Sequence, residues 1–193
     1  MRVLGIDPGS RYLGFGVVEW RSGRALHVGH GVLRLDGKAP LARRLQQVFV
    51  ELKLVLEGFE PDAVAVEGVF THKNARSALV LGHARGVALL LAAQAGLDVF
   101  EYAPAKVKRA VGAGGNDSKD SVARMVKMQL ALTEPIERAD ASDALAVALC
   151  HLHRARGARP AVSNSPLVRA RGGAPADFYA RLKPSVVPAR RAS

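Results

Sequence analysis

The chain has 193 residues, of which 49% are apolar and 23% charged, a composition typical of one globular domain with some additional chain. Its 28 Lys and Arg residues outnumber its 17 Asp and Glu residues and give a net charge of +11, so we expect a polyanionic partner such as nucleic acid. The longest uncharged stretch, residues 86–97, is too short to span a bilayer, and a single cysteine, Cys150, excludes an internal disulfide and a thiolate zinc cluster.

The first part of the chain predicts a β-meander and a helix. Apolar or alternating runs at residues 3–7, 13–20 and 25–35 are separated by glycine-containing turns, which indicates three antiparallel strands. Apolar side chains then recur at spacings of three and four over residues 41–57. This spacing predicts an amphipathic helix.

Helices and strands alternate after that point. The apolar run at residues 62–67 predicts a strand buried on both faces, and residues 74–95 and 97–102 predict a long helix and a fifth strand. Three more helical segments are expected from Pro104 on, the last of them over residues 139–151. This order predicts an α/β fold with a mixed five-stranded sheet, three strands antiparallel and two parallel, flanked by helices.

The last 40 residues differ in composition from the rest. From Arg154 onward there are nine Arg or Lys residues, one acid and five prolines with little periodicity, so residues 1–153 carry a net charge of only +3. We therefore expect one domain over residues 1–153 and a disordered basic tail over residues 154–193. The tail is either a solubility segment or a sequence-independent tether for phosphates.

Four acidic residues stand out by their positions. Asp7 and Glu67 end the first and fourth predicted strands, and in open α/β sheets sites form at the carboxyl ends of strands. Asp140 and Asp143 lie three residues apart at the start of the last predicted helix, on one face. Taken singly, these acids can open a turn or cap a helix. Taken together, they offer the hard oxygen ligands that Mg²⁺ or Mn²⁺ prefers, and two such ions can hydrolyse a phosphodiester.

Five runs of sequence, in order along the chain, form a family pattern. They are Leu-Gly-Ile-Asp-Pro-Gly-Ser-Arg at 4–11, Glu-Gly-Val-Phe at 67–70, Lys-Asn-Ala-Arg-Ser-Ala-Leu at 73–79, Leu-Gly-His-Ala-Arg-Gly at 81–86 and Asp-Ala-Ser-Asp-Ala-Leu-Ala at 140–146. Together they resemble the RuvC family, the bacterial Holliday-junction resolvases, over about residues 2–153. The resemblance implies a ribonuclease H-like fold, a homodimer, and metal-dependent symmetric nicking of four-way DNA junctions in strands of like polarity. His83 and Ser142 stand where the family usually has glutamine and alanine.

The resemblance also implies roles for single residues. The four catalytic carboxylates of the family, which hold two Mg²⁺ or Mn²⁺ ions, correspond to Asp7, Glu67, Asp140 and Asp143. Phe70 corresponds to an aromatic residue that contacts the junction, and Lys108 and Lys119 to lysines important for catalysis. The cations that we expect at DNA phosphates are Arg11, Lys73, Arg76, Lys108 and Lys119.

Partners and location are also expectations. Gly82 and Gly86 lie one turn apart on the predicted helix at residues 74–95 and allow close packing, either on a second copy or on the protein's own sheet. The resemblance implies an association with a branch-migration complex, although no docking motif is visible. With no basic and apolar leader after Met1, we expect a cytoplasmic protein without a membrane partner.

Three other functions compete with this interpretation. Actin-like and sugar-kinase ATPases start with a similar strand and glycine turn, but they need two such domains, for which 193 residues are too few. Ribonuclease H proper uses similar carboxylates on RNA/DNA hybrids and is separated by a substrate test. A non-enzymatic nucleic-acid binder would place four acids on its binding face, which repels phosphate. We therefore expect a structure-selective DNA endonuclease of recombination and repair.

Overall fold

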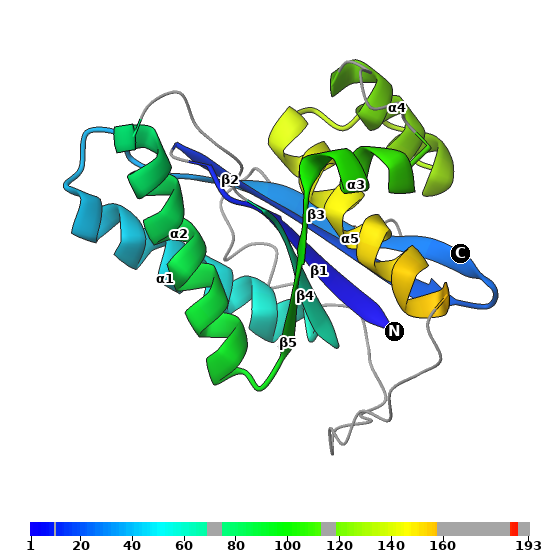
Figure 1. Cartoon of the computed structure of the whole chain (residues 1–193), viewed down its shortest axis with the longest axis horizontal. Coiled ribbons are helices and arrows are strands. Elements are labelled where there is room, and N and C mark those ends of the chain that lie inside the picture. Colours follow the sequence, from blue (N-terminus) through cyan, green and yellow to red (C-terminus); the bar gives the residue numbers. More distant parts are fainter. Residues whose placement is uncertain (10, 69–74, 113–118, 158–185, 189–193) are drawn as a thin grey trace.

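The computed structural model describes residues 1–9, 11–68, 75–112, 119–157 and 186–188, with only the backbone described at 75–77, 119, 157 and 186–188. The strands are β1 (Arg2–Asp7), β2 (Tyr12–Arg21), β3 (Arg24–Arg34), β4 (Ala63–Glu67), β5 (Asp98–Tyr102) and β6 (Val186–Pro188). The helices are α1 (Leu41–Phe59), α2 (Ala75–Gln94), α3 (Pro104–Ala110), α4 (Lys119–Gln129) and α5 (Ala139–Gly157) (Figure 1). The five strands expected from the sequence are confirmed to within one residue at each end.

The strands form one mixed sheet in the order β5-β4-β1-β2-β3-β6. β1, β2 and β3 form the expected antiparallel meander, and β4 and β5 run parallel to β1. β6 was not expected, because its three residues come from the predicted tail; it pairs antiparallel with residues 29–31 of β3. The α/β architecture with a mixed central sheet is thus confirmed, with one short strand added at the β3 edge.

A two-residue turn sets the register of the β2–β3 hairpin. Ser22 and Gly23 both have positive φ, 53° and 81°, as in the type I′ turn that suits the twist of a hairpin. Arg21 therefore pairs with Arg24 next to the turn, and Tyr12 pairs with Arg34 at the other end of the hairpin. The two ends of β3 therefore lie at opposite ends of the hairpin, one beside the turn and the other beside the start of β2.

Helices cover both faces of the sheet (Figure 1). Leu4, Phe15 and Leu52 belong to a buried cluster that the sheet forms with α1 and α2. Val3 and Leu149 belong to a second cluster on the other face, under α3, α4 and α5. Val3 and Leu4 are neighbours in β1, so successive strand residues enter different clusters, as strand geometry requires. In the described part of the chain, no helix has the length and apolar character needed to cross a membrane.

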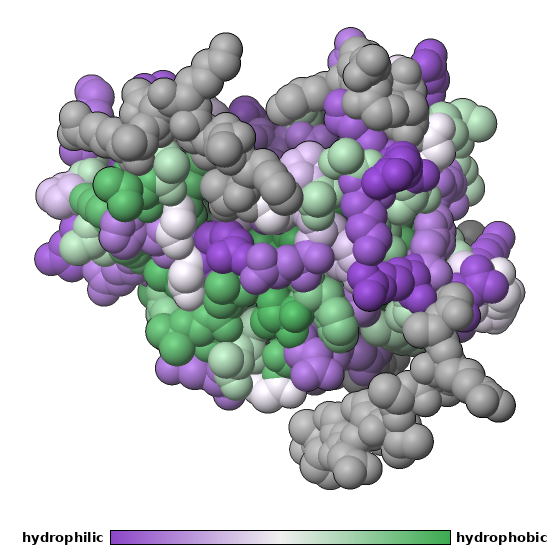
Figure 2. Space-filling model, in the orientation of Figure 1, coloured by the Kyte–Doolittle hydropathy of each residue, from purple (hydrophilic) through white to green (hydrophobic). Residues whose placement is uncertain are grey.

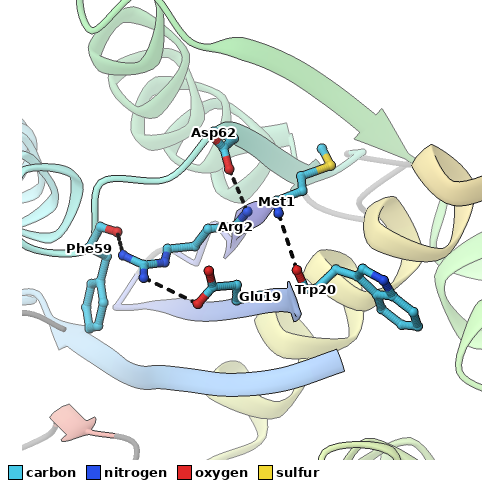
Figure 3. Close-up of polar contacts among 6 residues, drawn as sticks. All are labelled: Met1, Arg2, Glu19, Trp20, Phe59 and Asp62. Atoms are coloured by element: carbon cyan, nitrogen blue, oxygen red, sulfur yellow. Dashed lines mark hydrogen bonds and ion pairs between the residues drawn. The ribbon is translucent and has the colours of Figure 1, made fainter. Parts of the chain in front are cut away.

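A buried arginine fixes the connection between α1 and β4. Arg2 is 4% exposed; its Nη1 donates to the carbonyl of Phe59 at 2.6 Å and its Nη2 lies 3.4 Å from the carboxylate of Glu19 (Figure 3). The backbone N–H of Arg2 donates to the side chain of Asp62 at 2.7 Å. Removing the Glu19 carboxylate would leave the buried guanidinium charge less well paired, which is costly. These bonds keep the start of β4 beside the start of β1.

The last helix is longer than expected. α5 continues to Gly157, past the boundary predicted at residue 153. Basic composition does not end a helix, because Arg and Ala are good helix formers, and the helix ends at the first glycine after them. Arg156 also lies 3.5 Å from the centre of the Trp20 ring, a cation–π contact that holds this last turn. Cys150 is buried in this helix.

Candidate active site

Asp7 and Glu67 lie at one edge of the sheet. Asp7 ends β1 and Glu67 ends β4, and these parallel neighbours pair Ile6 with Val66. Because neighbouring parallel strands end at the same edge, the two acids follow this pair side by side. Both side chains are half-buried. The backbone therefore brings the ends of β1 and β4 together, as the sequence predicts.

Two glycines let α5 lie directly on the strands that carry Asp7. A Cβ at Gly5 would overlap the carbonyl oxygen of Ala144, and a Cβ at Gly14 would overlap the carbonyl oxygen of Asp140. Gly14 pairs with Asp7 across the β1–β2 ladder, so the start of α5 rests on the residue opposite Asp7. Gly5 and Asp7 are two residues apart in one strand, so the Asp7 side chain lies on the face that α5 covers.

This contact also positions the helical acids. Asp140 and Asp143 lie in the first turn and a half of α5, which begins at Ala139. Ala141 and Ala144 are buried, whereas the two acids are half-buried. The backbone therefore brings all four acids that the sequence singled out to one corner of the sheet.

The side-chain carboxylates of these four acids do not form one cluster. Within the described ranges, no three His, Cys, Asp or Glu side chains lie close enough together to hold a metal ion. The carboxylate of Asp140 instead pairs with Arg138, with Oδ2 and Nη2 3.2 Å apart. The guanidinium of Arg138 also lies 3.8 Å from the centre of the Tyr12 ring. An exposed ion pair of this kind contributes about 0–1 kcal/mol, so turning the Asp140 side chain away costs little.

The donor set suits a hard divalent cation. Carboxylate oxygens are the ligands that Mg²⁺ and Mn²⁺ prefer, and this corner offers four of them without a thiolate. The backbone of Asp140 rests on Gly14, the residue opposite Asp7, so a third acid starts from the same corner. The residues therefore fit such a metal in chemistry and in backbone position.

Arg11 lies at the same edge, and Lys108 belongs to a helix that starts from it. Arg11 is exposed immediately before β2, four residues after Asp7. Lys108 is half-buried in the last turn of α3, a helix that follows the end of β5 after one residue and packs against α5. Because β5 ends at the edge where Asp7 and Glu67 lie, α3 starts from that edge.

Other expected residues are placed less fully. Phe70 and Lys73 lie outside the described residues, as does most of the loop before Lys119. Arg76 and Lys119 are described in backbone only, at the second residue of α2 and the first residue of α4. The contacts of these four side chains stay predictions.

Sequence reasoning missed a buried tyrosine–histidine pair beside Glu67. The hydroxyl of Tyr102 lies 2.7 Å from Nδ1 of His151, and both residues are buried. The carbonyl of Tyr102 accepts a hydrogen bond at 2.8 Å from the N–H of Gly68, the residue after Glu67. Burial raises the pKa of Tyr102 and lowers the pKa of His151, so both side chains are neutral at pH 7. The pair thus joins the end of β5 to α5 and holds the chain that leaves Glu67.

Both the sequence and the fold resemble known proteins. The family model for "Crossover junction endodeoxyribonuclease RuvC" matches residues 3–151. RuvC of Myxococcus xanthus is 64% identical over 186 residues, which is 96% of each chain. The structure of T. thermophilus RuvC in complex with a Holliday junction substrate matches with a TM-score of 0.74 at 35% identity, over 81% of this chain and 96% of that one. The yeast mitochondrial Holliday junction resolvase Ydc2, at 13% identity and a TM-score of 0.56, covers 77% of this chain and 76% of its own and shares the fold.

Proposed function

This chain belongs to the RuvC family of crossover junction endodeoxyribonucleases, and we infer that it resolves four-way DNA junctions at the corner formed by Asp7, Glu67 and the start of α5. The family match spans the domain that carries all four acids. A family relative has been solved with a Holliday junction substrate. The reaction is hydrolysis of phosphodiester bonds in DNA recombination and repair, and we propose that it is symmetric, in strands of like polarity.

One contact carries this proposal most directly. The carbonyl of Asp140 rests on Gly14, and Gly14 lies opposite Asp7 in the β1–β2 ladder. If the acids at the start of α5 only capped the helix, α5 would not need to lie so close to β2 that a side chain at position 14 is excluded. The contact instead sets two acids of the helix beside two acids of the sheet, where their mutual repulsion favours a bound cation.

We propose that the corner holds two Mg²⁺ or Mn²⁺ ions through Asp7, Glu67, Asp140 and Asp143. When bound, such ions lower the pKa of a water molecule and stabilise the leaving oxygen of an in-line displacement. The residues around these acids orient them. The Tyr102 carbonyl holds the chain after Glu67, and Gly14 holds Asp140 against the sheet.

We propose that three residues around this corner act on the DNA directly. Lys119 and Lys108 offset negative charge near the scissile phosphate. Phe70 follows β4 three residues after Glu67, and we propose that its ring stacks on a base unstacked at the crossover. The cations proposed to contact backbone phosphates are Arg11, Lys73, Arg76, Lys108 and Lys119.

We also propose that a second copy of the chain packs on α2. Leu79 and Leu90 are 64% and 54% exposed and line an apolar groove between α2 and α1. A Cβ at Gly82 or Gly86 would meet no atom within 4 Å, so these glycines do not serve packing on the protein's own sheet. Apolar residues gather over α2 in Figure 2. A two-fold dimer through this groove would cover them and supply the two active sites that paired nicks require.

Three further expectations stay proposals. The basic tail expected over residues 154–193 would tether the enzyme to phosphates without regard to sequence. A branch-migration complex would be its partner at the junction. Its site of action would be the cytoplasm, where bacterial DNA lies.

The test offers labelled four-way junction, linear duplex and RNA/DNA hybrid to the full chain, with chelator and with Mg²⁺ or Mn²⁺. We expect paired nicks in the junction alone, only with a divalent cation. Cleavage of the hybrid in preference to the junction would indicate ribonuclease H activity instead. Junction binding without cleavage under every metal condition would indicate a binding protein and contradict the proposal.

A further inference from the structure

A basic hollow lies beside the proposed active site. Its volume is about 630 Å³, and it is lined by Arg11, Tyr12, Arg34, Leu35, Asp36, Gly37, Lys38 and Gln47. Its walls are the residues just before β2 on one side and the connection from β3 to α1 on the other. The end of β3 and the start of β2 lie at the edge of the sheet that also carries Asp7.

Hydrogen bonds across the hollow fix its shape. The N–H of Leu35 donates to the carbonyl of Arg11 at 2.9 Å and joins the two walls. The side chain of Gln47, on α1, donates to the carbonyl of Arg34 at 2.8 Å and accepts from the N–H of Asp36 at 3.3 Å. The carboxylate of Asp36 in turn accepts from the N–H of Lys38 at 2.9 Å. These hydrogen bonds therefore hold in place the backbone that carries Arg11, Arg34 and Lys38.

The charge of the hollow is not balanced. Arg11, Arg34 and Lys38 are all exposed, and none of them makes an ion pair with any residue that the structure describes. Asp36 is the single acid among the lining residues, and its carboxylate already accepts a backbone hydrogen bond. Three cations around one acid attract an anion, and arginine pairs well with phosphate oxygens.

The hollow also has a defined distance from the proposed site of cleavage. Arg34 pairs with Tyr12, which is two residues along β2 from Gly14, the partner of Asp7. With neighbouring strands about 4.8 Å apart and a rise of about 3.3 Å per residue, the backbones of Arg34 and Asp7 are about 12 Å apart. Leu33 and Leu35 belong to the cluster under α1, so the Arg34 side chain points to the face that carries Asp7.

We propose that this hollow binds a backbone phosphate of one duplex arm of the junction, through Arg34 and Lys38 together with Arg11. The hollow is only about 12 Å from Asp7 along the sheet, so the bound phosphate lies a few nucleotides from the cut. The inference rests on the proposed junction cleavage and adds a contact that fixes where the arm lies relative to Asp7.

β3 provides a matched control at its other end. Arg24 is exposed like Arg34 and belongs to the same strand, but it lies next to the hairpin turn, ten residues away. At about 3.3 Å per residue, the two arginines are about 33 Å apart. Substituting either one removes the same charge from the same strand, so a difference between the two variants reports position and not net charge.

The first experiment measures junction affinity against salt concentration without divalent metal, for the wild-type chain and for Arg34→Gln, Lys38→Gln and Arg24→Gln. Each phosphate contact contributes about 0.9 to the slope of log affinity against log salt, which is about threefold in affinity between 50 and 200 mM. We expect Arg34→Gln and Lys38→Gln each to lower the slope by about one and Arg24→Gln to leave it unchanged. Equal slopes for Arg34→Gln and Arg24→Gln would overturn the inference.

The second experiment places one neutral methylphosphonate at successive positions in the arm. We expect the wild-type chain to lose affinity when the substitution lies at one position a few nucleotides from the cut, and Arg34→Gln to show no further loss there. An equal further loss in the variant would contradict the assignment. Metal-dependent cleavage by the wild-type chain serves as the reference. If this cleavage is absent, the proposed function fails. If the cleavage is present but Arg34→Gln keeps the wild-type slope of affinity against salt, only this inference fails.

Discussion

Arg138 holds the carboxylate of Asp140 at an N–O distance of 3.2 Å and so keeps one proposed metal ligand occupied by a neighbouring cation. The guanidinium is itself stacked 3.8 Å from the centre of the Tyr12 ring. Binding of a divalent cation by Asp140 must therefore compete with Arg138. Because the side chains are 42% and 30% exposed, the competition is weak, in the range of about 0–1 kcal/mol for such pairs.

Arg138→Gln is expected to lower the metal concentration needed for half-maximal nicking by up to about fivefold, the equivalent of about 1 kcal/mol. The variant removes the competing cation and one positive charge near the metal ligands. Binding of Mn²⁺ to the protein without DNA, followed by electron paramagnetic resonance, should tighten in the same proportion. Arg138→Lys should stay near the wild-type value. Unchanged Mn²⁺ affinity in Arg138→Gln would mean that the ion pair does not restrain Asp140.

Gly14→Ala is expected to destabilise the domain by about 1–3 kcal/mol, the usual cost of overpacking. The added methyl group would overlap the Asp140 carbonyl and push the start of α5 away from Asp7. Nicking should fall more than stability alone explains, because the helical acids move. Urea unfolding and junction cleavage measure the two effects. In Gly86→Ala, where a Cβ meets no atom of its own chain within 4 Å, the stability of the single domain should be kept or rise by about 0.5–1 kcal/mol.

Local patterns were sufficient for most elements of the fold. Alternation in the first strands, the Ser22–Gly23 turn and the spacing of leucines and valines in α1 are short-range signals, and all were visible in the sequence. β6 was missed because three residues in a proline-rich, basic segment have no strand signal of their own, and their pairing depends on the free edge of β3. The end of α5 was missed because the change in charge at Arg154 is a matter of composition and not of helix stability.

The acids of the corner could be predicted, but their surroundings could not. Strand ends and helix starts placed Asp7, Glu67, Asp140 and Asp143 at one edge. The overlap of Asp140 with a Cβ at Gly14 depends on how α5 crosses the sheet, which is a packing property. The pairing of Tyr102 with His151 joins residues distant in sequence for the same reason. Arg138 gave no signal, because an arginine before a helix is ordinary.

The His27–His30 pair predicts a loss of stability in mild acid. The pKa of each imidazole is lowered from 6.5 to about 4, by burial in both and, in His27, also by the charge of His30. The unfolded chain therefore takes up protons as pH falls from 6.5 toward 4 while the native pair stays neutral, so the free energy of unfolding falls over that range. At pH 5 the loss is about 2 kcal/mol per histidine.

Urea unfolding at pH 7.5 and pH 5 measures this dependence. The double variant with His27→Gln and His30→Gln should show a smaller difference between the two pH values than the wild-type chain. His83→Gln, at an exposed position of α2, should keep the wild-type difference. An equal difference in the double variant would show that other groups carry the acid sensitivity.

Leu79→Glu is expected to convert the protein to a monomer in sedimentation velocity, because a charge would be buried at the proposed two-fold contact. On a supercoiled plasmid with an extruded cruciform, the variant should give single nicks where the wild-type chain gives linear product. Met128→Glu on α4, where Met128 is 68% exposed, adds the same charge on the other helical layer and should leave assembly unchanged. A dimeric Leu79→Glu protein would place the interface elsewhere.

The four acids are tested by single amide substitutions, Asp7→Asn, Glu67→Gln, Asp140→Asn and Asp143→Asn. Each keeps the shape of the side chain and removes one negative charge, which a metal site built mainly from carboxylates tolerates poorly. Nicking should fall at least 100-fold, on the order of the loss seen when a ligand-supporting group of a metal site is removed. Junction binding without metal should persist or tighten, because one acid no longer repels phosphate.

Stability separates this role from a helix-capping role. A cap at Asp140 or Asp143 would cost about 1 kcal/mol when removed, whereas relief of repulsion among metal ligands keeps or raises the free energy of unfolding without metal. Asp98→Asn provides the control, since Asp98 is exposed at the start of β5, at the opposite edge of the sheet, and its loss should leave nicking unchanged. If Asp140→Asn or Asp143→Asn nicks junctions at the wild-type rate, that residue is not a metal ligand and serves only at the start of the helix. Wild-type nicking by all four variants would move the chemistry away from this corner altogether.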